Sequence, residues 1–534
     1  MINYLNQNEK YKKKKIENKK IKNANIERMT VEDSETIFLK AKVDKNLIAF
    51  TVLLTLIYFF TITFAFEVGN IILFTLLILG EVFHVFQVIM YMYTIWDMEY
   101  EAPRKNDHVE PVDIFVTVAG EPLDIVEETI LAIKNIDYPT FNVYILNDGY
   151  VAKKENWQEM EELAENLGVQ CITRKTPGGA KAGNINNGMK NTHSPLIVVF
   201  DADHVPHRDF LKKTVPYFFD KKVGFVQSPQ YYKNYNLNYV TKSAWEQQQL
   251  FFGPICRGKN RMNATTMCGT NMVIRRQAME EVGGMSETSI AEDFLTGLLM
   301  HERGWKSVYV AEILAEGLAP EDFLSYFKQQ FRWARGALDL VFPKNRILEG
   351  NMTWRQRLQY FSSVSFYFSG TVVLMNALIP TVYFFTGIVP LVTSTMVLAS
   401  IFLPYLFLTL YILQKSSNFN FTFRALTFSL GAFNIHLLAL WSAISNKKAT
   451  FSITPKKQVS GNFIRLATPH ILYVLLVFIG IIYAFIRDGA TASFIANTSW
   501  GLLNIAVFIP TIYAASPRKS PISSLSENIA IKKI

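Results

Sequence analysis

Cysteine is scarce in this chain of 534 residues, which contains only three. Cys171, Cys256 and Cys268 are an odd number and lack the spacing of a zinc site. The cysteine content therefore argues against a disulfide scaffold and against a cysteine-based zinc site, and it fits a reducing compartment.

Two glycine motifs that commonly hold nucleotide phosphates are also missing. Residues 177–184 read PGGAKAGN, which matches neither GxxxxGK followed by Ser or Thr nor GxGxxG. Taken alone, this segment indicates a flexible loop whose lysine, Lys181, is able to contact a phosphate.

Positive charge is unevenly distributed along the chain. The formal net charge is +9 at pH 7, and eight lysines lie within the first 22 residues. Because this polar tail precedes hydrophobic runs, we interpret it as a topology signal or an anchor for anionic lipid rather than a nucleic-acid-binding segment. We expect membrane lipids, and no nucleic acid, among the partners.

Long apolar runs in both halves of the chain indicate membrane helices. Residues 47–66 and 71–96 each reach the roughly 20 residues needed to cross a bilayer. A second span follows the first at once, which is not typical of a cleaved signal peptide. Four further runs follow a long segment of mixed composition: residues 364–387, 391–413, 470–486 and 494–514. We therefore expect about six transmembrane helices.

Residues 419–445 are apolar but interrupted by Arg424, Asn434 and His436, which favours a helix lying at the membrane interface. Lysine and arginine are concentrated in both tails, in the central segment and between the last two pairs of helices. The positive-inside rule then predicts a multi-pass plasma-membrane protein with both termini and the central domain in the cytosol.

Two ionisable residues fall within the second apolar run. Glu81 and His84 are three residues apart and share one helix face. Ionisable groups at membrane depth are candidate functional groups. The alternative is a helix face packed against protein near a wet cavity.

Short β-branched runs alternate with helical stretches in the central segment. The runs at residues 112–118, 143–146 and 196–200 are typical of buried strands, and those at 124–135, 156–166 and around Met189 are typical of helices. This alternation predicts an α/β domain with a mainly parallel sheet. Ligands of such sheets bind at the carboxyl ends of the strands.

Acidic residues follow two of these strands. Asp148 lies in an Asn-Asp-Gly sequence, which alone is an ordinary turn. Asp201 and Asp203 follow the third strand, and two carboxylates so spaced can share a hard divalent ion with phosphate oxygens. Mg²⁺ or Mn²⁺ fits this pattern, and a solvated strand end is the alternative.

Glu292 and Asp293 begin an apparent helix over residues 294–303. Acidic residues in a first turn interact favourably with the helix dipole, so a capping role is one interpretation. The other makes Asp293 a general base.

Gln329, Arg332 and Trp333 lie within about one helical turn, directly before the membrane helices resume. An arginine can make charge-assisted contacts to a diphosphate. A tryptophan offers a flat apolar face to a sugar ring, and a glutamine can bind hydroxyl groups.

Together these residues resemble the processive family-2 glycosyltransferases, most closely those of the bacterial cellulose synthase type. The resemblance extends from about residue 112 to residue 456. It includes Asp148, Lys181-Ala182-Gly183-Asn184, Asp201-Ala202-Asp203-His204-Val205-Pro206, Cys268-Gly269-Thr270, Glu292-Asp293, Gln329 with Arg332-Trp333, and Phe451-Ser452-Ile453-Thr454-Pro455-Lys456, which is similar to the family's FxVTxK gating loop.

The resemblance implies a GT-A-type glycosyltransferase domain inserted in a membrane domain of about six transmembrane helices plus interface helices. We expect a basic tail at residues 1–46, two membrane helices at 47–98, the GT-A domain at 103–345, interface and membrane helices with the gating loop 447–460 in 346–515, and a second tail at 516–534.

Residue roles follow from the same resemblance. It implies that Asp148 and Lys181 contact the nucleotide, that Asp201 and Asp203 contact the nucleotide and its metal ion, and that Asp293 is the base. It also implies that Gln329, Arg332 and Trp333 line the junction of donor site and channel, and that Cys268 and Gly269 lie near the acceptor end. Phe451, Thr454 and Lys456 are implied to close over the bound donor.

The activity so implied is inverting polymerisation of glucose from UDP-glucose into a β-glucan that crosses the membrane. The linkage stays open between 1,4, 1,3 and mixed. Alternatives are a chitin- or hyaluronan-type synthase using UDP-N-acetylglucosamine, a non-processive transferase acting on a lipid phosphate, and a transporter that only senses nucleotide. Ala291 replaces the threonine usual before Glu-Asp. The chain ends about twenty residues after the last apolar run, so we expect any activation by cyclic di-GMP to need an accessory subunit.

Overall fold

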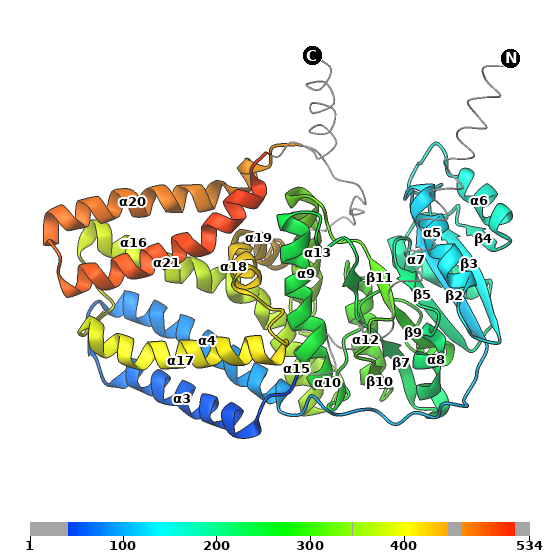
Figure 1. The fold of residues 1–534 in the computed structure, drawn as a ribbon, viewed down its shortest axis with the longest axis horizontal. Coiled ribbons are helices and arrows are strands. Elements are labelled where there is room, and N and C mark those ends of the chain that lie inside the picture. The colour runs from blue at the N-terminus through cyan, green and yellow to red at the C-terminus, as the bar shows by residue number, and fades with distance from the viewer. Residues whose placement is uncertain (1–40, 344, 447–460, 518–534) are drawn as a thin grey trace, which may run out of the picture.

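The computed structural model describes residues 41–343, 345–446 and 461–517. They form two bodies side by side, a bundle of long helices and an α/β domain (Figure 1). The α/β domain is inserted in the chain after the first two long helices. This arrangement confirms the predicted fold class.

A seven-stranded mixed sheet forms the centre of the α/β domain. Its strands, in spatial order, are β10 (Lys306–Tyr309), β7 (Val223–Gln227), β9 (Met272–Arg275), β5 (Leu196–Asp201), β2 (Val112–Val118), β3 (Phe141–Asn147) and β4 (Gln170–Thr173). Strand β9 is antiparallel to both neighbours, whereas the other adjacent pairs are parallel. All three predicted strands belong to this sheet.

The central strands of this sheet are largely hydrophobic along their whole length because both faces of the sheet are buried. Every residue of β2 is buried, including the polar Asp113. Arg276 Nη2 and the Ser194 N–H bind the Asp113 carboxylate at 3.1 and 2.8 Å, which compensates its burial. The domain also contains the helices α5 (Leu123–Lys134), α6 (Glu159–Leu167), α7 (Ala180–Lys190), α8 (Phe210–Thr214), α11 (Arg276–Glu281) and α12 (Glu292–Glu302).

A second, three-stranded sheet fixes the segment that follows β5. Its strands, in spatial order, are β6 (Val205–Pro206), β11 (Ala315–Gly317) and β8 (Tyr231–Tyr232). Strand β6 pairs antiparallel with β11, with Pro206 opposite Ala315. The turn between β5 and β6, which carries the predicted aspartates, is therefore held at both ends.

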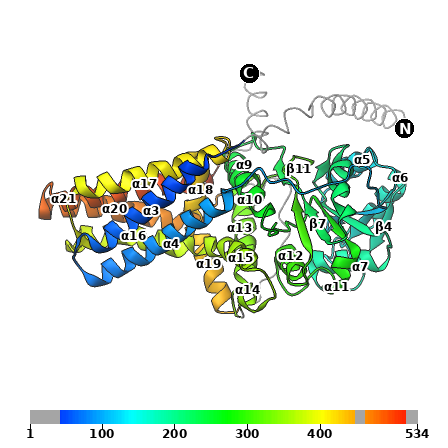
Figure 2. The same ribbon diagram turned by 90° about the horizontal axis from the view of Figure 1, so that it is seen from below.

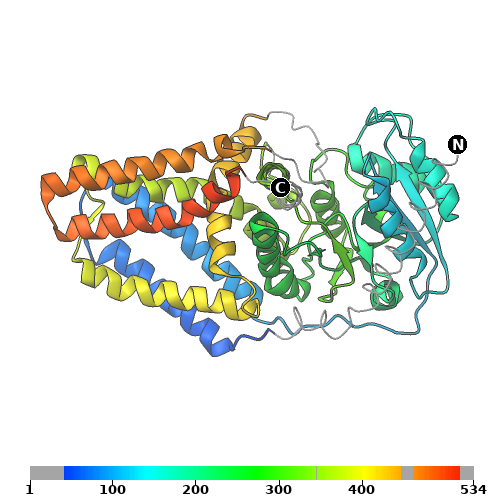
Figure 3. The ribbon, with the colours of Figure 1, turned by 45° about the horizontal axis from the view of Figure 1, so that its top comes forward.

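Six long apolar helices run alongside one another in the bundle (Figures 1 and 3). They are α3 (Lys45–Phe64), α4 (Ile71–Ile95), α16 (Ser369–Thr386), α17 (Thr395–Ser416), α20 (Thr468–Asp488) and α21 (Ala492–Ala515). Large apolar side chains such as Phe64, Ile72 and Ile486 are exposed on their surfaces. Exposed apolar surface on helices of this length supports a multi-pass membrane protein.

A seventh helical segment is also long and apolar enough to span a membrane. Among the described residues seven such candidates occur, and the additional one is Phe423–Ile444. It is bent at Ala432 into α18 (Phe423–Gly431) and α19 (Phe433–Ile444) and lies where the bundle meets the α/β domain (Figure 1). In its most apolar 18-residue stretch 56% of the residues are buried, against at most 39% in the same stretch of each of the other six candidates. Length and composition alone make this segment a candidate span, so the interface helix expected from the sequence stays a prediction.

Three further helical segments connect the two bodies. One runs from α9 (Tyr239–Leu250) through η2 (Phe251–Ile255) into α10 (Cys256–Asn260), and the others are α13 (Phe323–Leu338) and α15 (Trp354–Ser365). Helix α13 packs along α19, and α15 packs against α4. The α/β domain is therefore joined to the bundle by extensive helix packing.

Candidate functional site

A cavity of about 430 Å³ opens at the carboxyl ends of β3 and β5. Segments far apart in the chain line it, including the loop before α7, the start of α12 and one face of α13. Nine of the residues to which a role was assigned line it: Asp148, Lys181, Asp201, Cys268, Gly269, Asp293, Gln329, Arg332 and Trp333.

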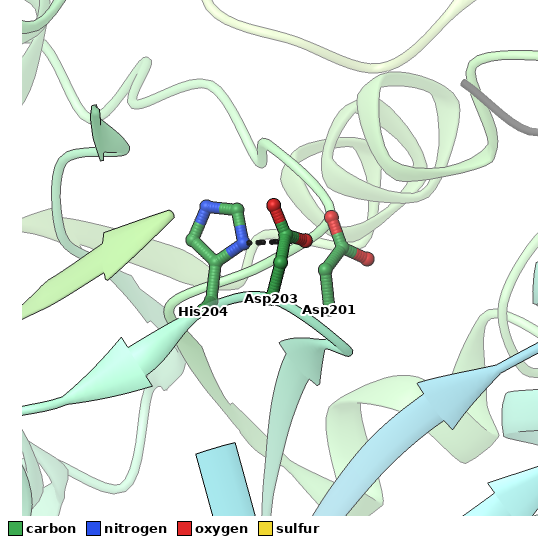
Figure 4. A group of neighbouring side chains, drawn as sticks. All are labelled: Asp201, Asp203 and His204. Atoms are coloured by element: carbon green, nitrogen blue, oxygen red, sulfur yellow. Dashed lines mark ion pairs between the residues drawn. The ribbon is translucent and has the colours of Figure 1, made fainter. Parts of the chain in front are cut away.

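Two aspartates and a histidine form a cluster in the turn after β5 (Figure 4). Asp201, Asp203 and His204 each offer one ligand atom, and these atoms lie within 4.8 Å of one another. The Asp201 N–H donates to Thr270 Oγ1 at 3.0 Å, and Asp203 Oδ2 accepts the Leu318 N–H at 3.0 Å. The backbone therefore holds both acidic residues in place. His204 was not among the predicted site residues, although it directly follows the two aspartates in the sequence.

The donor atoms of this cluster fit a divalent metal ion. Both ring nitrogens of His204 are buried and make no hydrogen bond with a described residue, and Nδ1 lies 3.4 Å from Asp203 Oδ1. Two carboxylates suit Mg²⁺ or Mn²⁺, and a neutral imidazole nitrogen is a common ligand of transition metals. Asp203 lies beneath the cavity rather than on its lining.

Asp148 is paired with an arginine that the sequence did not single out. Arg174 Nε and Nη2 donate to the two oxygens of Asp148 at 2.8 and 2.6 Å, and both side chains are almost fully buried. Burial raises the pKa of Asp148 even though the guanidinium acts in the opposite direction. Arg174 follows the edge strand β4, in the same way that Asp148 follows β3.

The same guanidinium holds the glycine-rich loop. Arg174 Nη1 donates to the Gly178 carbonyl, and Nη2 donates to the Ala180 carbonyl at 3.0 Å. Gly178 and Gly179 have φ values of +138° and +64°, which favour glycine. The loop that the sequence indicated as flexible is thus anchored to the Asp148 side of the cavity.

Lys181, at the start of α7, lies among the acidic groups of the cavity. Its ammonium group contacts Asp201 Oδ1 and donates to the Gly269 carbonyl at 2.8 Å. Burial lowers the pKa of Lys181, but Asp201, Glu292 and Asp293 outweigh burial and raise it. Lys181 is therefore a fixed positive charge on the lining of the cavity.

Asp293 presents one oxygen to the backbone and the other to the cavity wall. Oδ1 accepts the Phe294 N–H at 2.8 Å, and a Cβ placed on Gly269 would lie 2.8 Å from Oδ2. Gly269 has a φ of +78° and leaves this space open. Burial raises the pKa of Asp293, and burial together with the Asp293 charge raises the pKa of Glu292. Perturbed carboxyl groups in a cavity are typical of acid–base sites.

Three predicted residues share one face of α13. Gln329, Arg332 and Trp333 are spaced by three and four positions, and all three line the cavity. The buried Gln329 Oε1 makes no hydrogen bond within the described residues, so it can accept one from a ligand hydroxyl. The start of α13 is fixed by Asp322, whose side chain accepts the Ser325 N–H at 2.8 Å.

Helix α13 crosses the beginning of α12 at close range. A Cβ on Gly336 would lie 2.4 Å from the Ala291 Cβ, so only glycine permits this approach. The crossing brings the α13 face to Asp293, two residues beyond Ala291. Ala291 is the N-cap of α12 and makes no side-chain hydrogen bond to the first turn of the helix. The hydroxyl group of a threonine at this position is therefore missing from the helix cap.

Cys268 is held through its backbone, and its thiol donates to the Thr266 carbonyl at 3.4 Å. Its N–H donates to Gln227 Oε1 at 2.9 Å, and its carbonyl accepts from Gln230 Nε2 at 2.7 Å. Burial raises the pKa of the Cys268 thiol, which therefore stays protonated. The three residues assigned to the gating loop, Phe451, Thr454 and Lys456, lie outside the described residues.

Two family models match parts of this chain. Residues 110–336 match the model of the glycosyltransferase-like family 2, and residues 279–417 match that of cellulose synthase. The chain is related to the family-2 glycosyltransferases and to cellulose synthase. The α/β domain of this cellulose-synthase-like chain is accordingly a GT-A-type glycosyltransferase domain.

Individual proteins are similar to this chain over most of its length. Cellulose synthase 1 of Komagataeibacter xylinus is 29% identical over 435 residues, and the UDP-forming catalytic subunit from Pseudomonas fluorescens is 29% identical over 423 residues. These alignments cover 77% and 76% of this chain, but only 27% and 56% of the relatives' own lengths. A solved mannosyltransferase from Pyrobaculum calidifontis, in complex with GDP-Man and Mn²⁺, aligns with 70% of this chain and 100% of its own at 15% identity and a TM-score of 0.48.

Proposed function

We propose that this protein is a processive, inverting glycosyltransferase of the plasma membrane that polymerises glucose from UDP-glucose into a β-glucan and passes the product across the bilayer. The observation that carries the proposal is the single cavity that joins the Asp201 side, Asp293 and the α13 face next to the helical bundle. The match to cellulose synthase over residues 279–417 covers the α13 face and the first helices that follow it.

The donor nucleotide would occupy the side of the cavity formed by Asp148 and the Arg174-anchored loop. Lys181 would then meet the diphosphate, because its ammonium group lies between this loop and Asp201. Asp201, Asp203 and His204 would hold a Mg²⁺ or Mn²⁺ ion, which when bound neutralises charge on the leaving diphosphate. Arg332 would add a second positive charge from the opposite wall.

The acceptor hydroxyl would approach from the Cys268–Gly269 side of the cavity. Asp293 Oδ2 is directed toward Gly269, whereas Oδ1 is fixed by a backbone N–H, so one oxygen is positioned to remove the hydroxyl proton. The deprotonated oxygen attacks the anomeric carbon, and the bond to the diphosphate breaks on the opposite face. One displacement of this kind inverts the anomeric configuration, which turns an α-linked donor into a β-linked product.

Trp333 and Gln329 would bind the sugar next to the reacting centre. Their helix, α13, packs directly on α19 and approaches the bundle, so the product would leave toward the membrane helices. Both termini and the α/β domain would lie in the cytosol, where UDP-glucose is available.

The test is synthesis by the full-length protein in lipid nanodiscs with radiolabelled UDP-glucose and Mg²⁺ or Mn²⁺. We expect UDP release coupled to a polymer that organic solvent does not extract. Digestion with 1,4- and 1,3-specific β-glucanases then assigns the linkage. A product that stays lipid-extractable would show a non-processive transferase, and incorporation only from UDP-N-acetylglucosamine would show a chitin-type enzyme. Absence of sugar-dependent UDP release would overturn enzymatic activity altogether.

A further inference from the structure

Four side chains from three segments form a continuous stack at the junction of the two bodies. The Tyr93 ring of α4 lies 6.1 Å from the Trp354 ring of α15, with 27° between their planes. The Arg261 guanidinium, directly after α10, lies 5.3 Å from the Tyr93 ring centre. The Arg355 guanidinium lies 5.7 Å from the Trp354 ring centre. Each ring of the pair therefore has a cation over it.

The aromatic part of this stack lies where headgroups would surround a membrane helix. Trp354 is 60% exposed, and the nearby chain after α4 exposes Trp96 and Tyr100 by 40% and 43%. Trp96 and Tyr100 follow α4 and Trp354 begins α15, and these two helices meet where the bundle adjoins the α/β domain (Figure 2). Tryptophan and tyrosine are enriched at this depth because their rings are apolar and their N–H and O–H groups are polar.

The two arginines retain binding capacity. Arg261 Nη2 donates to the Tyr93 carbonyl at 2.7 Å and so caps the last turn of α4, but the buried Arg261 Nε makes no hydrogen bond within the described residues. Neither Arg261 nor Arg355 forms an ion pair with a carboxylate in the described part of the chain. Two carboxylates lie close to the end of α4: Glu99 is paired with Lys42, and Asp97 forms no ion pair with the arginines of the stack among the described residues.

We propose that this stack, Arg261–Tyr93–Trp354–Arg355, is a binding site for anionic phospholipid headgroups in the leaflet on the α/β-domain side. The guanidinium groups bind lipid phosphates, and Trp354 inserts among the headgroups. The source is a lipid rather than a soluble phosphate because the site adjoins apolar helix ends and presents exposed aromatic rings. Since the stack joins α4, α10 and α15, a bound lipid would also stabilise the attachment of the α/β domain to the bundle.

The proposal is tested with full-length protein in nanodiscs that contain brominated lipid. Bromine quenches a tryptophan at short range, and the contribution of Trp354 is isolated by subtracting the Trp354→Phe protein. We expect stronger quenching by brominated phosphatidylglycerol than by brominated phosphatidylcholine at equal mole fraction. The Arg261→Gln/Arg355→Gln protein should lose this preference, with roughly a fivefold loss of relative lipid affinity for each arginine.

A matched control removes two exposed positive charges outside the stack, Arg303→Gln/Lys190→Gln, and should keep the preference. If loss of the Arg261 cap prevents the double variant from folding, the single variant Arg355→Gln still tests the proposal. Because Arg355 is exposed, its replacement should reduce the preference for phosphatidylglycerol without affecting the fold. Equal quenching by the two lipids in the unmodified protein would overturn the proposal. The proposal would also be overturned if Arg355→Gln and the double variant both kept the preference. It would be overturned as well if inorganic phosphate or UDP removed the preference in the unmodified protein.

Discussion

The guanidinium of Arg174 is bound at two points to the carboxylate of Asp148, at 2.8 and 2.6 Å, and it also holds the carbonyls of Gly178 and Ala180. One buried side chain thus joins Asp148, on the proposed nucleotide side of the cavity, to the loop that carries Lys181. Arg174 is a positioning residue in this arrangement.

Replacing Arg174 with lysine keeps the charge but removes the two-point geometry. We expect the KM for the UDP-sugar to rise about 10- to 100-fold, since a hydrogen bond to a charged group contributes roughly 1.5–3 kcal/mol. The kcat should change less, because Asp293 is untouched. Direct UDP binding by calorimetry separates the two effects, and Arg208→Lys, at an exposed position, is the control. Unchanged UDP binding in Arg174→Lys would contradict the assignment.

Asp293 is tested by replacement with asparagine, which keeps the shape and the bond from the Phe294 N–H. We expect polymer synthesis to fall by roughly 10²–10⁴-fold, the usual contribution of a general base. Donor binding should persist, because the proposed nucleotide contacts of Asp148, Lys181 and Asp201 are unchanged in this variant. Asp124→Asn, an exposed acidic residue of α5, should retain full activity. Robust turnover by Asp293→Asn would remove Asp293 from the mechanism.

The acidic pair at the start of α12 predicts a particular pH dependence. Asp293 must be ionised to act as a base, and its pKa is raised by burial, so activity should be lost as the pH falls through a value above that of an ordinary aspartate. Glu292 and Asp293 repel each other when both are ionised. Glu292→Gln should therefore move the acidic limb of the kcat/KM profile to lower pH.

The free energy of unfolding should also depend on pH through Glu292. Whereas activity is lost as the pH falls, this contribution to stability is lost as the pH rises. A carboxyl group whose pKa is raised in the folded state favours folding while it is protonated, so this stabilisation is lost as the pH rises through the folded value. Thermal unfolding at several pH values should show this loss in the unmodified protein and a smaller one in Glu292→Gln.

The kcat/KM profile tests the repulsion between the two carboxylates. If its acidic limb stays in place or moves to higher pH in Glu292→Gln, the proposed repulsion is excluded.

Much of this site could be predicted because its residues follow strands or share a helix turn. Asp148 and Asp201 were found at strand ends, and Gln329 and Trp333 by helical spacing. Arg174 was missed because β4 is a short edge strand, only partly buried, so no hydrophobic run marked it. The anchoring of the 178–180 loop was missed for the same reason. The close packing of α13 on α12 depends on a contact across 45 positions of sequence, which no local pattern reports.

His204 provides a test of the metal site that does not depend on turnover. If its imidazole is a ligand, His204→Ala should weaken Mn²⁺ binding in the presence of UDP by about tenfold or more, measured by electron paramagnetic resonance. His207→Ala is the matched control, because His207 instead contacts Glu316 at 3.0 Å and is not in the cluster. Equal Mn²⁺ affinity in both variants would leave the two aspartates as the only ligands from this turn.

The contact between Gly336 and Ala291 links helix packing to catalysis. Gly336→Ala places a methyl group where the Ala291 Cβ already lies, so α13 must move away from α12. Overpacking of this kind costs about 1–3 kcal/mol, and here it would also separate Trp333 and Gln329 from Asp293. We expect lower thermal stability together with reduced kcat. Adding Ala291→Gly removes the opposing methyl group and should restore part of both, which a double-mutant cycle would detect as coupling. Additive losses would show that the crossing of α12 and α13 does not set the geometry of the site.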